Sequence, residues 1–267
     1  MWNRSELKKR GKVNFKKSYW KSVLVCIILL FLPVGMGGGG SSVSSSTSSF
    51  IDNQVNDDYD GDQIYDEYPG NETFVEENID TFFNTFAPIF MIVAIIVFTV
   101  VILIKLLVAY PLQIGANNFF MNMREREGSL DGLIFIYKSG KLKNSIITMF
   151  MQEFFIFLWS LLLLVPGIIK SYEYRMIPYI LCENPNIDRK RAFEISKQMM
   201  KGNKWDTFIL DLSFIGWHIL STITFGLVGI FHVNPYVQAT NAELYAVLRE
   251  DAIVNRYVDE IELIGFN

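Results

Sequence analysis

The stretch that decides the fold runs from residue 183 to residue 217 and reads ENPNIDRKRAFEISKQMMKGNKWDTFILDLSFIGW. Its first half is polar and basic, and its second half leads into a long apolar run. In the first half, apolar residues recur at helical spacing opposite the basic ones, which predicts an amphipathic helix. We therefore expect an elbow at residues 184–203 on the cytoplasmic surface of a membrane, followed by a span that enters the bilayer.

The elbow helix has clear ends and two distinct faces. Asp188 is a typical N-cap and Gly202 a typical end. Ala192, Ile195 and Met199 lie on the predicted apolar face. The basic face consists of Arg189, Lys190, Arg191, Lys197 and Lys201. That face is expected either to bind anionic lipid head groups or a cytoplasmic partner, or only to fix the orientation of the chain through its positive charge.

Composition places the whole chain in the membrane class. Of 267 residues, 51% are hydrophobic and only 19% are charged, and the apolar residues form several long runs. These values predict an all-α, multi-pass bundle of about six transmembrane helices with both termini in the cytoplasm. Two far-separated cysteines, Cys26 and Cys182, indicate neither a disulfide framework nor a zinc site, and two histidines are too few for a histidine metal cluster.

The chain begins with a basic arm and a short apolar run. Residues 1–21 carry eight lysines and arginines against one acid, Glu6, and are expected to form a cytoplasmic helix at the membrane surface. Residues 22–36 are interpreted as the first span. A signal peptide is the alternative, but no typical cleavage site follows the run, so we favour an uncleaved span.

Residues 37–85 are interpreted as a flexible, acidic loop outside the cell. Their first part is rich in glycine and serine, and their second part is rich in aspartate and glutamate. No lysine or arginine occurs between Met36 and Lys105. By the positive-inside rule, the loop is external and the N-terminus is cytoplasmic.

Residues 86–250 are expected to form the membrane helical bundle, and residues 251–267 a cytoplasmic tail. No internal repeat is evident. Two of the helices, residues 168–183 and 234–249, are semi-polar, and the sequence leaves open whether they cross the bilayer completely. Residues 146–182 have a second interpretation as a re-entrant pair of helices. The predicted spans of the bundle are Phe86–Tyr110, Ile146–Val165, Ile168–Glu183, Phe208–Phe231 and a helix from Pro235 to about Leu248.

A family resemblance rests on three segments of the chain. They are KSYEYRMIPYILCENPNIDRKRAFEISKQMMKGNKWDTFILDLSFIGW, then NPYVQATNAELY, and the opening WNRSELKKRGKVNFKKSYWKSV. The chain resembles the bacterial integral membrane family filed as domain of unknown function 975, and more distantly the membrane domain attached to some glycerophosphodiester phosphodiesterases. Only residues 37–85 are expected to be specific to this chain. The resemblance implies a helical multi-pass protein of the bacterial plasma membrane and transfers no catalytic residue.

Four of the charged residues within the predicted spans are expected in the cytoplasmic third of the bilayer, and Lys170 and Glu173 are expected to lie further out. The four are Lys105, Glu153, Arg175 and Asp211. Charges at this depth are costly unless they are paired or hydrated. One interpretation is a polar cavity that binds a head group or passes a proton, and the other is a structural ion-pair network. The pair we expect is Glu153 with Arg175, because a hairpin at Pro166-Gly167 would bring their helices together.

The external loop contains the one candidate metal site. Acidic residues alternate around a glycine in NDDYDGDQIYDE, residues 56–67, as in calcium-binding loops. The candidate ligands are Asp58, Asp60, Asp62, Asp66 and Glu67. The alternative is a solvated acidic loop that binds no ion. Apart from calcium at this loop, we expect no cofactor.

For function, the sequence favours a non-enzymatic membrane factor that acts in envelope homeostasis or on partner membrane proteins. No catalytic triad, phosphate-binding loop or dinucleotide fingerprint is present. A small transporter or channel subunit with a polar intramembrane cavity is the alternative, and a lipid-modifying enzyme is third. The expected partners are the lipid bilayer, anionic head groups and other membrane proteins, and nucleic acid is excluded because the basic residues face the membrane surface.

Overall fold

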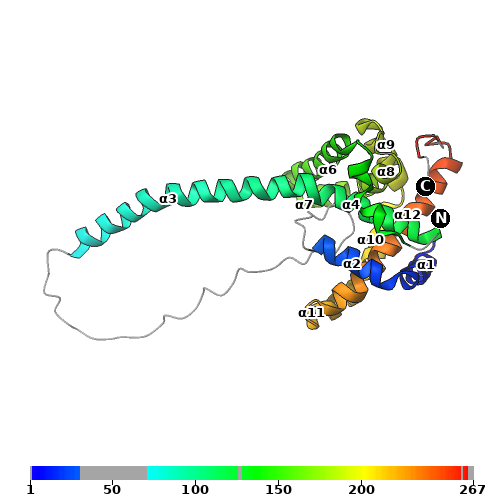
Figure 1. Ribbon diagram of the computed structural model, residues 1–267, viewed down its shortest axis with the longest axis horizontal. Coiled ribbons are helices and arrows are strands. Elements are labelled where there is room, and N and C mark those ends of the chain that lie inside the picture. The colour runs from blue at the N-terminus through cyan, green and yellow to red at the C-terminus, as the bar shows by residue number, and fades with distance from the viewer. Residues whose placement is uncertain (1, 31–70, 126–127, 260, 264–267) are drawn as a thin grey trace. The chain divides into compact units, whose positions relative to one another are not determined.

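The computed structural model describes residues 2–30, 71–125, 128–259 and 261–263, and side chains are described within these ranges except for residues 71–85. All regular structure in these ranges is helical (Figure 1). The chain divides into two units, which we describe separately. One consists of Met1–Ser42 with Leu103–Asn267, and the other of Val43–Ile102. The all-α prediction is confirmed.

The smaller unit is described from residue 71 onward, as the helix α3. This helix runs from Asn71 to Ile104 and contains Pro88. The expected loop at 37–85 is therefore wrong for residues 71–85, which are helical; the rest of that loop, with the candidate calcium ligands, and residues 31–36 of the first span lie outside the described residues. Beyond Phe86 the helix is almost wholly apolar, and its large side chains are exposed.

Two helices of the described chain are long and apolar enough to cross a bilayer. One is the continuous helix Phe86–Glu125, and the other is Leu142–Leu162. The first consists of α3, the π-helical turn η1 (Lys105–Ala109) and α4 (Tyr110–Glu125). The helix of the predicted span Phe86–Tyr110 therefore continues to Glu125.

The core of the larger unit lies around three helices, α4, α8 (Ile177–Glu183) and α12 (Asn234–Val254). Every residue of α8 is buried, as are most residues of α4 and α12. Of the two segments that the sequence marked as semi-polar, residues 174–183 and most of 234–249 are packed inside the protein, whereas residues 168–173 are exposed or partly exposed. Residues 168–183, however, do not form one helix. They are divided between α7 (Leu164–Glu173) and α8, with a turn at residues 174–176.

The N-terminal helix α1 (Arg4–Lys17) packs along α12 (Figure 1). Leu7 and Phe15 are buried, and Gly11 allows a close approach to α12, since a Cβ at this position would lie 2.9 Å from the Thr240 backbone. The arm is helical as expected and its buried side chains pack on α12, and its place at the membrane surface stays a prediction. The next helix, α2, runs from Tyr19 to Leu30.

Two helical hairpins follow in the larger unit. The first joins α6 (Leu142–Leu162) to α7, and the chain turns at Leu163, where the backbone is extended. The expected turn at Pro166-Gly167 is wrong by three residues, because proline is accommodated in the first turn of α7. Short elements η2 (Leu130–Ile134) and α5 (Phe135–Lys138) precede this hairpin.

The second hairpin replaces the single span expected at Phe208–Phe231. The chain forms α10 (Lys204–Leu212), α11 (Ile215–Ile223), a turn at residues 224–226, and the π-helical η3 (Gly229–Val233). Phe225 and Gly226 adopt positive φ angles of 51° and 85°, which reverse the chain direction. The span prediction failed because a long apolar run carries no mark of where it turns back.

The elbow helix α9 runs from Arg189 to Met200 and matches its prediction. The Asp188 side chain accepts a hydrogen bond from the Arg191 backbone. The residues of the predicted apolar face are buried, and Gly202, with φ of 82°, follows the helix end. Local capping and periodicity were sufficient here, because both ends and both faces are encoded within one short segment.

Candidate functional site

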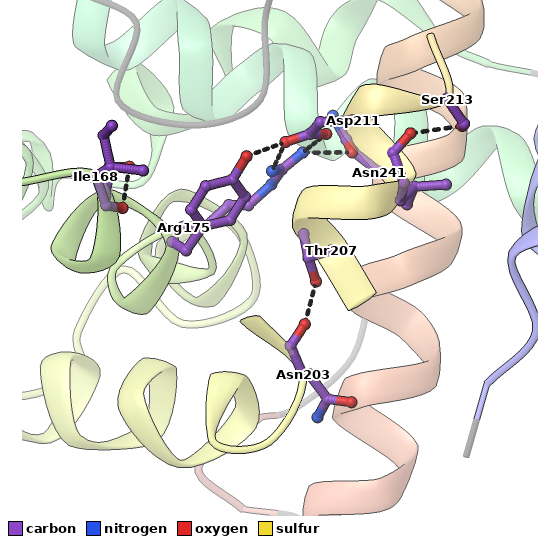
Figure 2. Close-up of polar contacts among 10 residues, drawn as sticks. Ile168, Arg175, Asn203, Thr207, Asp211, Ser213 and Asn241 are labelled. Carbon is purple, nitrogen blue, oxygen red and sulfur yellow. Dashed lines mark hydrogen bonds and ion pairs between the residues drawn. The ribbon is translucent and has the colours of Figure 1, made fainter. Parts of the chain in front are cut away.

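The most elaborate polar site of the larger unit is centred on Arg175, in the turn between α7 and α8. Its guanidinium donates hydrogen bonds of 2.5 and 2.9 Å to the two carboxylate oxygens of Asp211 in α10. Figure 2 shows the two side chains pointing toward each other. Arg175 also donates to the Asn241 side chain of α12 at 2.9 Å, and the Tyr172 hydroxyl donates to Asp211 at 2.8 Å.

This network connects three parts of the chain. Arg175 is only 4% exposed, so its positive charge is removed from water. A buried charge of this kind is tolerated only with an opposite charge and satisfied hydrogen bonds. The forked guanidinium supplies both, because it reaches two acceptor side chains at once. We infer that the network fixes the position of α10 and α12 relative to the α7–α8 turn.

A second ion pair lies between η1 and α6. The ammonium group of Lys105 contacts the Glu153 carboxylate, and the Tyr110 hydroxyl donates to the same oxygen at 2.9 Å. Lys105 opens the π-helical turn, where one extra residue shifts the register of the helix that follows. Both charged side chains are partly exposed, at 26% and 21%.

The four predicted intramembrane charges therefore form two separate pairs. The expected Glu153–Arg175 pair is wrong. The hairpin does bring the two helices together, since Phe155 of α6 and Tyr174 beside Arg175 both pack on Phe193. Arg175, however, lies in the turn that ends α7, and its side chain points to α10 and α12 instead of α6.

A family model described as "Protein of unknown function (DUF975)" matches residues 70–252. The chain belongs to the DUF975 family. The match confirms the family resemblance and includes residues 70–85, which were expected to be specific to this chain. The opening segment lies outside the matched range, and the similarity to the phosphodiesterase membrane domain stays a prediction. No curated protein and no solved structure matches the chain.

The DUF975 region also holds two buried acidic residues that are not among the four charges expected to pair. Glu183 of α8 forms an ion pair of 2.6 Å with Arg249 and accepts a hydrogen bond from Tyr245 at 2.9 Å. Glu243 of α12 accepts hydrogen bonds from Arg124 at 2.8 Å and from Asn14 at 2.7 Å. The sequence could have pointed to these two residues. An acidic residue in a helix that is expected to pack inside the bundle requires a partner.

The pattern of paired charges extends to the α7–α10 contact of this DUF975 protein. Glu173 lies 3.0 Å from the Lys170 ammonium group and 3.3 Å from that of Lys204. Lys170 also lies over the Trp159 ring at 5.3 Å. The first hairpin is thus joined to the start of α10 by a small charged cluster.

Of the predicted basic face, Arg189, Lys190, Lys197 and Lys201 are exposed. Arg191 departs from the prediction, because its guanidinium forms hydrogen bonds of 2.7 and 2.9 Å with Glu262 in the C-terminal tail. It also donates to the Tyr257 carbonyl at 3.0 Å. The Arg191 guanidinium lowers the pKa of Glu262 below its ordinary value. Arg191 therefore holds the tail of this DUF975 protein on α9.

A metal centre finds no support in the described residues. In these ranges, no three histidine, cysteine or acidic side chains are grouped so that they could hold an ion. Both cysteines are buried and unpaired with each other. The calcium hypothesis concerns residues 58–67, which lie outside the described part of this DUF975 protein, and it stays a prediction.

Proposed function

We propose that the chain is a non-enzymatic integral membrane protein of the bacterial plasma membrane, which acts in envelope homeostasis or on partner membrane proteins. Both termini lie in the cytoplasm in this proposal, and the chain crosses the bilayer more than once. Two long apolar helices support membrane insertion. The distribution of lysine and arginine supports the orientation, because these residues are missing between Met36 and Lys105.

The observation that carries the proposal is that the four intramembrane charges have opposite partners. Lys105 pairs with Glu153 and Arg175 with Asp211, and each pair joins separate elements of the chain. A group that transfers protons or attacks a substrate needs access to that substrate, and a two-hydrogen-bond contact with a guanidinium occupies the carboxylate. The geometry therefore supports a role in holding helices together.

The exposed basic residues of α9, together with those of α1, support contact with anionic lipid head groups. Arg189, Lys190, Lys197 and Lys201 project from α9, whose other face is buried in the core. Each lysine or arginine close to an anionic membrane surface contributes about 1 kcal/mol to binding. Four such residues on one short helix provide a sizeable electrostatic attraction.

A transporter or channel subunit is the second candidate, and one observation favours it. The carboxylates of Asp211 and Glu153 are 29% and 21% exposed, so the two pairs are not sealed on every side. Water or an ion that reached these oxygens would find two acidic groups at the predicted depth of the cytoplasmic leaflet. The two candidates therefore differ in whether the interior beside the pairs is wet.

Cysteine labelling distinguishes the two candidates without breaking either ion pair. Thr207 and Met149 are buried and lie one helical turn before Asp211 and Glu153, respectively. Each is replaced by cysteine in a full-length variant that lacks Cys26 and Cys182, and inverted membrane vesicles are treated with a water-soluble maleimide. A cysteine at the exposed position 201 is the control. The membrane factor predicts labelling at 201 alone.

Labelling at 207 and 149 as fast as at 201 would overturn the closed network and favour the transporter. A failure of the protein to remain in the vesicles would overturn the membrane proposal itself. The two results are separate, since the first is read as a labelling rate and the second as protein content of the vesicle fraction.

A further inference from the structure

The two helical hairpins of the larger unit are built in the same way. In the first, α6 turns at Leu163 into α7, and in the second, α11 turns at residues 224–226 toward η3. Each is closed by a glycine against a serine of the opposite arm. A Cβ on Gly167 would lie 2.1 Å from the Ser160 hydroxyl, and a Cβ on Gly229 would lie 2.3 Å from the Ser221 hydroxyl.

Both hairpin tips expose large apolar side chains. Each of the five consecutive residues from Leu161 to Val165 is between 64% and 73% exposed. Phe225 is 97% exposed, with Ile223 at 69% and Leu227 at 60% beside it. Apolar groups gathered in this way are covered by something in a working protein. A loop in water would instead carry polar residues.

Several backbone groups in the turns of both tips are paired within the tip itself. Leu163 donates its N–H to the Trp159 carbonyl at 3.1 Å, and Gly226 donates to the Ser221 carbonyl at 2.8 Å. In the second tip, the Thr224 hydroxyl donates to the Leu220 carbonyl and accepts from the Val228 N–H. Such internal pairing favours a hydrocarbon surrounding, because hydrocarbon offers no water to an open backbone group.

The length of the uncharged segment decides how deep the first hairpin reaches. No charged residue occurs between Glu153 and Lys170. From Leu163, ten residues lead back to Glu153 and seven lead on to Lys170, which at 1.5 Å per residue is about 15 and about 10 Å. The hydrocarbon core is about 30 Å thick. If the tip reached the opposite face of the hydrocarbon core, Lys170 and Glu173 would lie near the bilayer centre.

The second hairpin has similar dimensions. α11 has nine residues, which corresponds to about 14 Å. α11 follows α10, whose first residues are Lys204 and the 69% exposed Trp205, and η3 leads into α12. Lysine and tryptophan are typical of the interface between hydrocarbon and water. Lys204 shares Glu173 with Lys170, so the start of α10, which leads to the second hairpin, lies beside the charged base of the first hairpin.

We propose that both hairpins are re-entrant: they enter the bilayer from the cytoplasmic side, and their tips end among lipid acyl chains near its centre. The charged cluster of Lys170, Glu173 and Lys204 then lies at the cytoplasmic interface. This inference rests on the proposed membrane function and refines it. Both ends of each hairpin remain on the cytoplasmic side, so the proposed orientation of the termini is unchanged, while residues 142–233 no longer cross the bilayer.

Depth-dependent fluorescence quenching tests this inference on the full-length protein. Single cysteines at 163 and 225, in the variant lacking Cys26 and Cys182, are labelled with bimane and reconstituted into liposomes. The lipids carry a nitroxide quencher either near the head group or near the methyl end of the acyl chain. Cysteines at position 141, the exposed start of α6, and at position 97, in the middle of the apolar part of α3, are the controls.

If the hairpins are re-entrant, the deep quencher should quench positions 163 and 225 more strongly than the shallow one does. The shallow quencher should act more strongly at position 141. An impermeant maleimide should not react with cysteines at 163 or 225 from either side of the membrane. Stronger shallow quenching together with labelling from outside would overturn the inference, because the tips would then cross. A second result would also overturn the inference: the tips are not quenched, position 97 is quenched, and the cysteines at position 163 of two copies crosslink. The tips would then contact each other between copies of the chain. Loss of quenching at position 97 as well would instead overturn the membrane proposal. If a tip variant is not monodisperse, cysteines at the exposed positions 162 and 227 give the same readout.

Discussion

Arg175 and Asp211 lie 36 residues apart in sequence, yet the guanidinium of one forms two hydrogen bonds with the carboxylate of the other. Asn241 and Tyr172 complete the arrangement, so that the α7–α8 turn, α10 and α12 meet at one arginine. The contact explains how a short, interrupted set of helices holds a defined position. It also supplies the first testable consequence of the structure.

Arg175→Met and Asp211→Asn should each lower the free energy of unfolding by about 3 kcal/mol, because each leaves a charge without its partner. The double variant should lose less than the sum of the two, since no charge is then left alone. Thermal unfolding in detergent measures all three, and Lys201→Ala, at an exposed position, is the control. Additive losses would show that the two side chains act independently.

Gly167→Ala should destabilise the first hairpin by about 1–3 kcal/mol, as overpacking does. The added Cβ would lie 2.7 Å from the Ser160 Cα, and backbone cannot move aside as a side chain can. Gly216→Ala is the matched control: it lies in α11 with nothing within 4 Å of the added Cβ. It should be neutral or stabilise by about 0.5 kcal/mol. The same unfolding assay compares them, and equal effects would contradict the close contact.

Gly229→Ala should cost less than Gly167→Ala, because its closest contact is the Ser221 hydroxyl and no Ser221 backbone atom is among the nearest neighbours. Adding Ser221→Ala should restore most of the loss, whereas Ser160→Ala should not rescue Gly167→Ala. Unfolding temperatures of the four variants in detergent provide the measurement. Rescue in both hairpins, or in neither, would mean that the two turns are packed differently from the structure.

The Arg191–Glu262 contact should make the attachment of the C-terminal tail depend on pH. The pKa of Glu262 is lower in the folded protein than its ordinary value, mainly through its hydrogen bond to Arg191. The stabilisation is therefore complete above the unfolded-state pKa of about 4.3 and is lost as pH falls through the lower folded-state pKa. Unfolding temperatures of the wild type and Glu262→Gln should differ at neutral pH and converge in acid. Glu250→Gln, at an exposed carboxylate of α12, is the control, and an unchanged difference in acid would contradict the contact.

Replacing Arg189, Lys190, Lys197 and Lys201 by glutamine should reduce stabilisation by anionic lipid. We expect the wild type to unfold at a higher temperature in nanodiscs of anionic lipid than in zwitterionic ones, and salt should reduce the difference. The quadruple variant should lose most of it. Arg191→Gln should lower the unfolding temperature in both lipids and leave the difference, because Arg191 contacts the tail. If the quadruple variant keeps the full difference in unfolding temperature between anionic and zwitterionic lipid, α9 does not face lipid.

The sequence predicted those features that are encoded locally. The Asp188 cap, the periodic apolar residues and Gly202 together located α9, and the composition of residues 86–110 located the long apolar helix. The family resemblance was also correct over residues 70–252. Charges inside apolar segments pointed to Lys105, Glu153, Arg175 and Asp211, and the structure gives each of them a partner of opposite charge.

The partners themselves were not predictable, because a charged side chain is directed by the tertiary packing around it. Arg175 lies in a turn whose position depends on α8 being buried, and the π-helical turn at Lys105 changes the register of the helix that follows. The turn at Phe225-Gly226 lies within a run that reads as one span, since hydrophobicity alone does not record a change of direction. The helical conformation of residues 71–85 was likewise hidden by their acidic composition.

Membrane insertion is the central claim, and alkaline carbonate extraction of the full-length protein tests it most directly. The chain should remain with the lipid pellet after the wash and leave it only when detergent is added, because α3 and the hairpins are held by hydrocarbon. A variant with Ile96→Asp and Val97→Lys, in the middle of the apolar part of α3, should be retained less well. Complete release of the unmodified chain by carbonate, without detergent, would contradict the account.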